Sequence, residues 1–268
     1  MKIVSIVNMK GGVGKTTISL GFSYELAQSF NKKVLLIDLD AQANVSLSIL
    51  NVNRLKSVDN EQKTIADLIS SNFRGLVGEK KPLNINDVII DNPWQINKGK
   101  MDLIPSSIRL FLTKRMLKSE HYAEELLSKL LLQSQNNLDY DFCIIDCPPD
   151  FDTLVINALT ASNYYLIPAE PDYLSQQGLV VLEVLINECK EHLKCKRLGI
   201  IINKIPPTRG KFHKQVIKEL EEKYVNEILA KIPQKQIYSS WHNEHKPLKE
   251  KVGRGPFIEI AKRLIESD

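Results

Sequence analysis

The sequence lacks the features that mark secreted, membrane-spanning or disulfide-stabilised proteins. Its four cysteines, Cys143, Cys147, Cys189 and Cys195, form no C-x-x-C pair, the spacing from which many zinc and redox sites are built. No apolar run approaches the ~18 residues of a membrane span, and the apolar stretch at residues 3–7 is too short for a signal peptide. We therefore expect a cytoplasmic protein with free thiols.

The chain also has no linker rich in glycine, serine or proline, no internal repeat and no low-complexity tract. Its 268 residues are enough for one large domain or two small ones. Because no linker divides the chain, we interpret residues 1–268 as a single domain.

Short apolar runs alternate with longer helical patterns along the chain. The runs cover residues 2–7, 33–38, 101–105, 141–146, 163–168, 197–203 and 227–233. Continuous apolar runs are typical of parallel strands buried on both faces, and the helical patterns at 15–30, 107–135 and 175–193 are long enough for crossovers. The pattern predicts an α/β fold: a doubly wound, mostly parallel twisted sheet with helices on both faces. The polar residues 51–63 and 78–100 are expected to be surface excursions.

A glycine-rich segment, KGGVGKTT at residues 10–17, follows the first predicted strand and precedes a helical pattern. In that context backbone N–H groups cradle phosphates, Lys15 reaches the β- and γ-phosphates, and the Thr16 hydroxyl ligates Mg²⁺. The predicted nucleotide contacts of the loop are Gly11, Gly12, Val13, Gly14, Lys15, Thr16 and Thr17. The first glycine of the usual pattern is replaced by Met9, and Lys10 is an additional lysine. The alternative is a glycine-rich turn that binds nothing.

Two further predicted strands end in carboxylates, Asp38 and Asp146. They reach the carboxyl edge of a parallel sheet, where ligands of such folds bind. Asp146 is predicted to hold Mg²⁺ beside Thr16, and Asp40 to orient the attacking water. The alternatives are a turn carboxylate at Asp146, which precedes two prolines, and a cap after the strand at Asp40.

These segments resemble the ParA family of deviant Walker A ATPases. KGGVGKTT matches the family's phosphate loop, DLDAQAN (38–44) its switch I segment, and CIIDCPPD (143–150) its Walker B and switch II segments. The resemblance covers nearly the whole chain, with Ala41 standing where many members have proline. It implies a P-loop NTPase fold, slow partner-stimulated ATP hydrolysis with Mg²⁺, and catalytic roles for Lys10, Lys15 and Asp40.

The resemblance also implies roles that depend on a second subunit and on the nucleoside. Lys10 would cross the interface of an ATP-bound sandwich homodimer and contact the partner's phosphates, as an arginine finger does. By its place at a strand end, Asn203 is a candidate for hydrogen bonding to adenine, and Pro233 lies in a segment that resembles the family's base-flanking loop. For Asn203 the alternative is a turn former.

Positive charge is concentrated in the last quarter of the chain. Residues 196–268 hold 16 Lys and Arg against 9 Asp and Glu, which favours binding of polyanions. The candidate DNA-binding residues are Lys204, Arg209, Lys211, Lys214, Lys218, Lys251 and Arg254. The alternative is a solvated face that binds nothing.

We therefore expect a partitioning or positioning ATPase that binds DNA non-specifically and associates with the nucleoid in its ATP state. A ParB-like centromere-binding protein or cargo adaptor would stimulate hydrolysis and release it; plasmid, chromosome or protein cargo all fit. No helix-turn-helix precedes the phosphate loop, so operator-specific repression is not expected.

The main alternative is a MinD-like switch that docks on membranes through its C-terminal segment, although Glu266 and Asp268 oppose binding to an anionic bilayer. An iron–sulfur scaffold would need paired cysteines, and a bacterial tyrosine kinase of this superfamily would usually end in a tyrosine cluster, whereas the last tyrosine here is Tyr238. A small-molecule ATPase remains an alternative without a recognisable substrate site.

Overall fold

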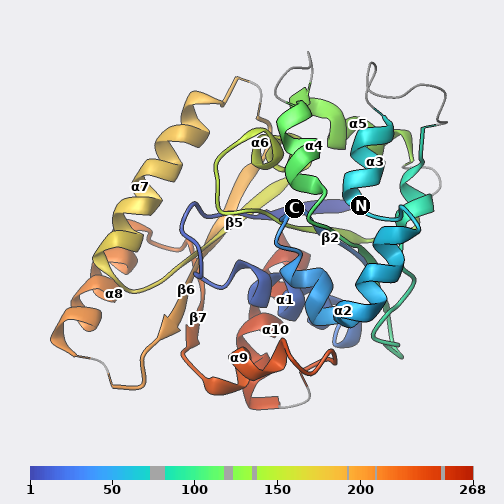
Figure 1. Ribbon diagram of the computed structural model, residues 1–268. Helices are drawn as coiled ribbons and strands as arrows, with labels where there is room; N and C mark the ends of the chain where they lie inside the picture. Colours follow the sequence, from blue (N-terminus) through green and yellow to red (C-terminus); the bar gives the residue numbers. More distant parts are fainter. Residues whose placement is uncertain are drawn as a thin grey trace.

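A seven-stranded sheet forms the centre of the protein (Figure 1). The computed structural model describes residues 1–72, 82–117, 123–134, 138–191, 193–208, 210–248 and 251–267. The strands are β1 (Lys2–Ile6), β2 (Lys33–Asp38), β3 (Lys100–Ile104), β4 (Phe142–Asp146), β5 (Tyr164–Ala169), β6 (Lys196–Ile205) and β7 (Ile228–Pro233). Their order is β3-β2-β4-β1-β5-β6-β7.

Every pairing between these strands is parallel, so their carboxyl ends meet at one edge of the sheet. The seven apolar runs each became a strand, and the predicted doubly wound α/β fold is confirmed. From β1 the chain continues to β2 and β3 on one side of the sheet, and from β4 it continues to β5, β6 and β7 on the other side. The direction in which strands are added therefore reverses beside β1. Ligands of open α/β sheets bind outside the carboxyl ends at such a reversal.

Helices cover both faces of the sheet, in two layers that are separate in Figure 1. One face carries α3 (Ile65–Ser71), α4 (Leu110–Leu117), α5 (Leu126–Gln133), α6 (Thr153–Ala161), α7 (Tyr173–Glu188) and α8 (Lys211–Lys223). The other carries α1 (Lys15–Gln28), α2 (Asn44–Asn60), α9 (Gln236–Trp241) and α10 (Lys251–Glu266). Each face of the sheet has its own hydrophobic core beneath the helices. Neighbouring strand residues such as Leu35 and Leu36 belong to different cores, because successive side chains of a strand point to opposite faces.

Two expectations about irregular segments need correction. Residues 51–60, expected to be a surface excursion, are helical and belong to α2, which is kinked at Asn51 (φ 58°). The helix forms because Leu55 and Val58, three residues apart, pack into the core while the polar residues face solvent. Residues 82–99 are largely irregular, as expected, with a short 3₁₀ helix at Ile85–Val88, and 78–81 lie outside the described residues.

The predicted helical pattern at 107–135 contains two helices, α4 and α5, with a 3₁₀ turn at Ala123–Glu125 before the second. Residues 118–122 and 135 lie outside the described part of the chain. All four cysteines are free, as predicted. Within the described residues, none of the helices is both long enough and apolar enough to cross a bilayer.

The C-terminal helix α10 packs against α1 and β7 rather than standing away from the sheet. Phe257, Ile260 and Leu264 are essentially fully buried. The Arg254 guanidinium reaches Glu25 of α1 with two N–H···O bonds of 2.5 and 2.9 Å and also lies over the ring of Tyr24. The Glu25 side chain is only 1% exposed, so this bidentate pair neutralises a carboxylate inside the fold.

We expect Arg254→Ala to lower the free energy of unfolding by about 3–5 kcal/mol, because it leaves the Glu25 carboxylate buried without a counter-ion. Urea unfolding followed by circular dichroism measures the change. Lys262→Ala, an exposed lysine on the same helix, is the matched control and should stay within about 0.5 kcal/mol of the native protein. Equal stability of the two variants would contradict the role assigned to Arg254.

Candidate nucleotide site

The phosphate loop connects β1 to α1 at the carboxyl edge of the sheet. Gly12 (φ 78°) and Gly14 (φ 94°) adopt the left-handed conformation that glycine accommodates without strain. A Cβ atom at Gly14 would lie 2.2 Å from the amide nitrogen of Asn203, so a side chain does not fit there. The N-cap residue of α1, Gly14, has no side chain to cap the first turn, and none of the residues in that turn is acidic. Its N–H groups and positive dipole end therefore remain available to an anion.

Lys15 turns back onto its own loop. Its Nζ donates to the carbonyl oxygens of Asn8 at 2.9 Å and Lys10 at 3.2 Å, and the residue is only 7% exposed. Burial lowers the pKa of Lys15, with the opposing charge of Asp146 as the next influence. The ammonium group thus lies inside the loop, where it can exchange carbonyl oxygens for phosphate oxygens of a nucleotide bound by the same subunit.

The Asp146 carboxylate links β4 to the first turns of α1. Its two oxygens accept hydrogen bonds from the hydroxyls of Thr16 (2.9 Å) and Ser19 (2.7 Å). Burial raises the pKa of Asp146 to about 6. The Asp146 carboxylate and the Thr16 hydroxyl thus place oxygen atoms side by side. Oxygen atoms of this kind are suitable ligands for a hard divalent cation such as Mg²⁺. Ser19 was missed by sequence reasoning, although it follows Thr16 by three residues and so lies on the same helix face.

Asp38 lies opposite Asp146 in the sheet register and is fully buried. One of its oxygens accepts from the backbone N–H of Ser46 at 2.8 Å and from its hydroxyl at 2.6 Å. Burial, and then the charge of Asp146, raise the pKa of the Asp38 carboxyl to about 8. Asp38 thus holds the start of α2 against β2, and a pKa this high favours the protonated carboxyl near neutral pH.

Asp40 lines the cavity that contains the phosphate loop. Its carboxylate accepts from the backbone N–H of Gln42 at 2.9 Å, which is the turn contact that the alternative interpretation describes. The two roles are compatible, because this bond uses one oxygen and the other can still orient water. Asp40 therefore remains the candidate for that task.

The cavity measures about 910 Å³ and extends from the phosphate loop to α9. Asn203 and Pro233, the two candidates for contacts with the nucleoside, both line it. The Asn203 amide donates to the carbonyl oxygen of Val13 at 2.7 Å, so in this structure it supports the phosphate loop. Gln234, which lies with Pro233 in the predicted base-flanking segment, lines the cavity as well. Sequence reasoning missed several lining residues around α9, because no local motif marks them: Lys235, Tyr238, His242, Asn243 and His245.

Lys10 points away from its own phosphate loop. Its Nζ contacts Glu170 at 3.0 Å, Asp172 at 2.9 Å and the Ser175 hydroxyl at 3.0 Å, all at or after the end of β5. Partial burial disfavours the ammonium, but the bonds to Asp172 and Glu170 outweigh it and raise the pKa of Lys10. Its side chain is 33% exposed, so Lys10 lies at the rim of the site.

Lys204 also lies at this rim rather than on a separate basic surface. It has φ 52°, and its Nζ bonds to the Gly12 carbonyl oxygen and to Glu170 at 2.8 Å. The structure thus brings Lys204 to the phosphate loop, which the sequence interpretation did not anticipate. Non-glycine residues with positive φ occur more often at functional sites than elsewhere.

The other candidate DNA-binding residues that the structure describes lie on two helices, α8 and α10, which cover opposite faces of the sheet. Lys211, Lys214 and Lys218 are exposed on α8, as their spacing predicts. Arg254 lies on α10, on the other face, and its guanidinium is occupied by Glu25. Arg209 lies outside the described residues, and of Lys251 only the backbone, at the start of α10, is described. The structure therefore does not bring α8 and α10 together as one cationic surface.

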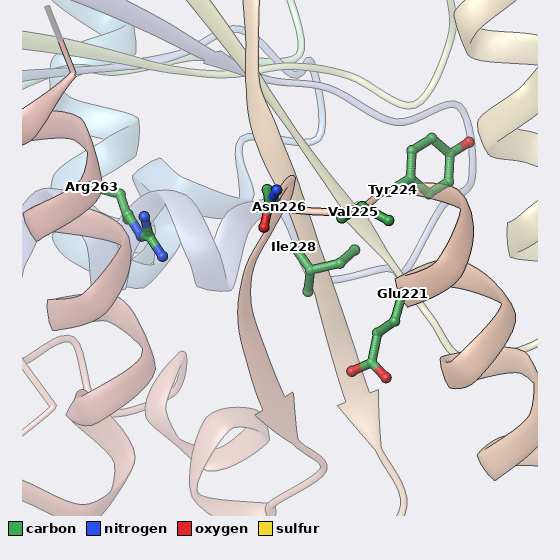
Figure 2. A pocket seen from close by; sticks show the side chains of 6 residues that line it. All are labelled: Glu221, Tyr224, Val225, Asn226, Ile228 and Arg263. Carbon is green, nitrogen blue, oxygen red and sulfur yellow. The ribbon is translucent and has the colours of Figure 1, made fainter.

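A smaller cavity of about 440 Å³ lies at the amino end of β7, away from the phosphate loop. Figure 2 shows Arg263 on one side of it and Glu221 and Tyr224 on the other. Glu221 is paired with Lys231, and the figure shows no convergence of polar groups on one point. This cavity does not form a candidate site.

The protonated state of Asp38 predicts a pH dependence of stability. The folded protein keeps a proton to about pH 8 that the unfolded chain, with a carboxyl pKa of about 4, has lost. Between these two pKa values the folded state binds more protons, so Asp38 should make the free energy of unfolding fall as pH rises from about 4 to about 8, by at most ~1.4 kcal/mol per pH unit. Urea unfolding at several pH values measures this slope. Asp38→Asn should flatten it, and equal slopes in both proteins would argue against the assignment.

Known proteins are similar to this chain in sequence and in fold. The family model described as "AAA domain" matches residues 1–200. The chain is 29% identical to the sporulation initiation inhibitor protein Soj of Bacillus subtilis, with 98% of each chain covered. It is 32% identical to a ParA family protein of Chlamydia trachomatis, over 76% of this chain and 72% of that protein.

Among solved structures, the fold is similar to that of a putative plasmid partition protein of Borrelia burgdorferi bound to AMPPNP. The TM-score is 0.81, with 23% identity and coverage of 99% of this chain and 98% of that one. Together with the geometry of the phosphate loop, the family match shows that this chain is an ATPase and belongs to the ParA/Soj family of partitioning ATPases.

Proposed function

We propose that the protein is an ATP-driven partitioning switch. ATP and Mg²⁺ bind at the phosphate loop, with Thr16 and Asp146 holding the metal and Asn203 and Pro233 flanking the base. Two ATP-bound subunits form a sandwich homodimer, which binds DNA without sequence preference. A ParB-like centromere-binding protein or cargo adaptor stimulates hydrolysis, and the dimer then dissociates.

The observation that carries this proposal is the contrast between the two lysines of the loop. Lys15 is buried and turned into its own loop, so one subunit already supplies a cation for its own nucleotide. Lys10 is turned outward to the rim, on Glu170 and Asp172. A long side chain at the rim can leave these acids for the phosphates of a facing subunit, where a cation stabilises the transferring phosphoryl group.

The surface of α8 supports the DNA-binding part of the proposal. Lys211, Lys214 and Lys218 are exposed there. Lys218 is paired at 3.4 Å with Glu222 of the same helix, and an exposed pair of this kind is weak enough to open for a phosphate. A row of exposed lysines without base-reading side chains suits phosphate contacts, which carry no sequence preference.

The burial of α10 weighs against the MinD-like alternative. Membrane docking by this segment needs a free apolar face, whereas Phe257, Ile260 and Leu264 are packed against α1 and the sheet. The proposal therefore assigns the polyanion-binding surface to DNA rather than to lipid.

We expect Lys10→Ala to keep ATP binding but lose ATP-dependent dimerisation, with hydrolysis reduced about 10²- to 10³-fold. Light scattering coupled to gel filtration should show an ATP-dependent dimer for Asp40→Ala, in which hydrolysis is blocked, and a monomer for the Lys10→Ala/Asp40→Ala double variant. Lys15→Ala, which should not bind ATP, is the negative control. A dimeric double variant would remove Lys10 from the interface.

We expect the native protein to bind an unrelated DNA duplex in Mg²⁺–ATP but not in Mg²⁺–ADP. Replacing Lys211, Lys214 and Lys218 by alanine should weaken binding and reduce the slope of log K against log salt by about 0.9 for each DNA phosphate that is no longer neutralised. Fluorescence anisotropy across a salt series measures both effects, with Lys56→Ala, an exposed lysine on α2, as control. Binding to anionic liposomes instead of DNA would favour the MinD-like alternative.

A further inference from the structure

The residue that follows α9, His242, lies between the helix of the phosphate loop and the helix after switch I. Its Nε2 is 2.9 Å from the Thr17 hydroxyl of α1, and its Nδ1 is 2.8 Å from the Ser48 hydroxyl of α2. The imidazole also lines the nucleotide cavity. Helices α1 and α2 are thus joined through one ring that comes from a third part of the chain.

The positions of the hydrogens in this chain of bonds can be worked out from the acceptors. Ser48 lies 2.7 Å from the carbonyl oxygen of Asn44, which can only accept, so the single hydroxyl hydrogen of Ser48 goes there. Ser48 must then accept from His242, which places a hydrogen on Nδ1. A neutral imidazole with a hydrogen on Nδ1 has an acceptor at Nε2, so the Thr17 hydroxyl donates to the ring.

Burial supports the neutral form, because it lowers the pKa of His242 below its ordinary value. In this structure a directed series of hydrogen bonds therefore runs from Thr17 to His242 to Ser48 to the Asn44 carbonyl. His245, three residues further, also contacts α2 through the Leu47 carbonyl oxygen at 2.8 Å, so the turn after α9 is anchored on α2 at two points.

This direction has a consequence for phosphate binding. A phosphate oxygen only accepts hydrogen bonds, so Thr17 must offer its hydroxyl hydrogen to bind one. In this structure that hydrogen is given to Nε2. Thr17 can turn it to a phosphate and keep its contact with His242 only if Nε2 becomes the donor.

We propose that His242 is a positioning residue of the nucleotide site, changing from acceptor to donor toward Thr17 when a nucleotide phosphate binds. In this change Nε2 takes up a proton from solvent and Nδ1 releases one to solvent, so the ring stays neutral. Ser48 then donates to Nδ1, and the Asn44 carbonyl loses that donor. Phosphate occupancy is in this way transmitted to the first turn of α2, next to Asp40. The inference rests on the nucleotide site proposed above.

The direct test is the ¹⁵N spectrum of the histidine ring, which distinguishes a hydrogen on Nδ1 from one on Nε2. In the native protein without nucleotide, the signals that disappear in His242→Asn should report a hydrogen on Nδ1. After saturation with Mg²⁺–ADP they should report a hydrogen on Nε2. An unchanged ring state, in a protein shown to bind ADP, would overturn the inference.

Two substitutions separate positioning of Thr17 from a structural role. His242→Gln keeps an amide N–H near the place of Nε2, whereas His242→Asn keeps one only near the place of Nδ1, toward Ser48. Binding of a fluorescent ADP analogue should be about tenfold weaker for His242→Asn, the loss of roughly one hydrogen bond to a charged group. It should be close to native for His242→Gln and for His213→Asn, a control on α8.

The effect of His242→Asn should vanish in a Thr17→Val background, because the two residues then act as one unit. Equal nucleotide affinity of the native protein, His242→Gln and His242→Asn, with only the thermal unfolding midpoint changed, would reduce His242 to a structural contact and overturn the inference. If the native protein itself binds no ADP, and Lys15→Ala behaves the same, the nucleotide site and this inference both fall.

Discussion

The buried carboxylate of Asp146 connects strand β4, next to the central strand β1, to the first turns of α1. Its bonds to Thr16 and Ser19 set the distance between the sheet edge and the helix that follows the phosphate loop. The loop must span that distance within a few residues, and it does so with Gly12 and Gly14 in left-handed conformations. The cavity, the orientation of Lys15 and the free N–H groups of α1 all follow from this arrangement.

A second carboxylate, Asp38, lies beside Asp146 in the register and cannot ionise as readily in the same buried region. Its bonds to Ser46 hold α2 to the sheet, so the switch I segment between them is anchored at both ends. His242 then joins α2 to α1 from the opposite side of the cavity. The nucleotide site is therefore enclosed by elements that contact one another through polar side chains, and polar contacts of this kind can rearrange when a charged ligand enters.

The three lysines around the phosphate loop, Lys10, Lys15 and Lys204, differ in how deeply their side chains are buried. Lys15 is inside, whereas Lys10 and Lys204 share Glu170 at the rim. The acids that hold the rim lysines sit at the start of the crossover into α7. Movement of that segment would change the electrostatics of the phosphate loop without any change in the loop itself. Away from the site, Arg254 is committed to Glu25, so positive charge in the last quarter of the chain is partly structural rather than available to a ligand.

Much of this protein was determined by signals that are local in its sequence. The seven strands were found from apolar runs, and the phosphate loop from glycines between a strand and a helix, because backbone sterics and side-chain alternation act over a few residues. The helix at residues 51–60 was missed, because Leu55 and Val58 are its only buried apolar residues and the residues around them are mostly polar. Two apolar positions are too few to show a helical periodicity in the sequence. Contacts between distant residues were decided by the tertiary structure alone. Lys10 with Glu170, Arg254 with Glu25 and His242 with Thr17 are 160, 229 and 225 residues apart. Their meeting depends on which strands become neighbours and which face each helix covers, and no local pattern carries that information.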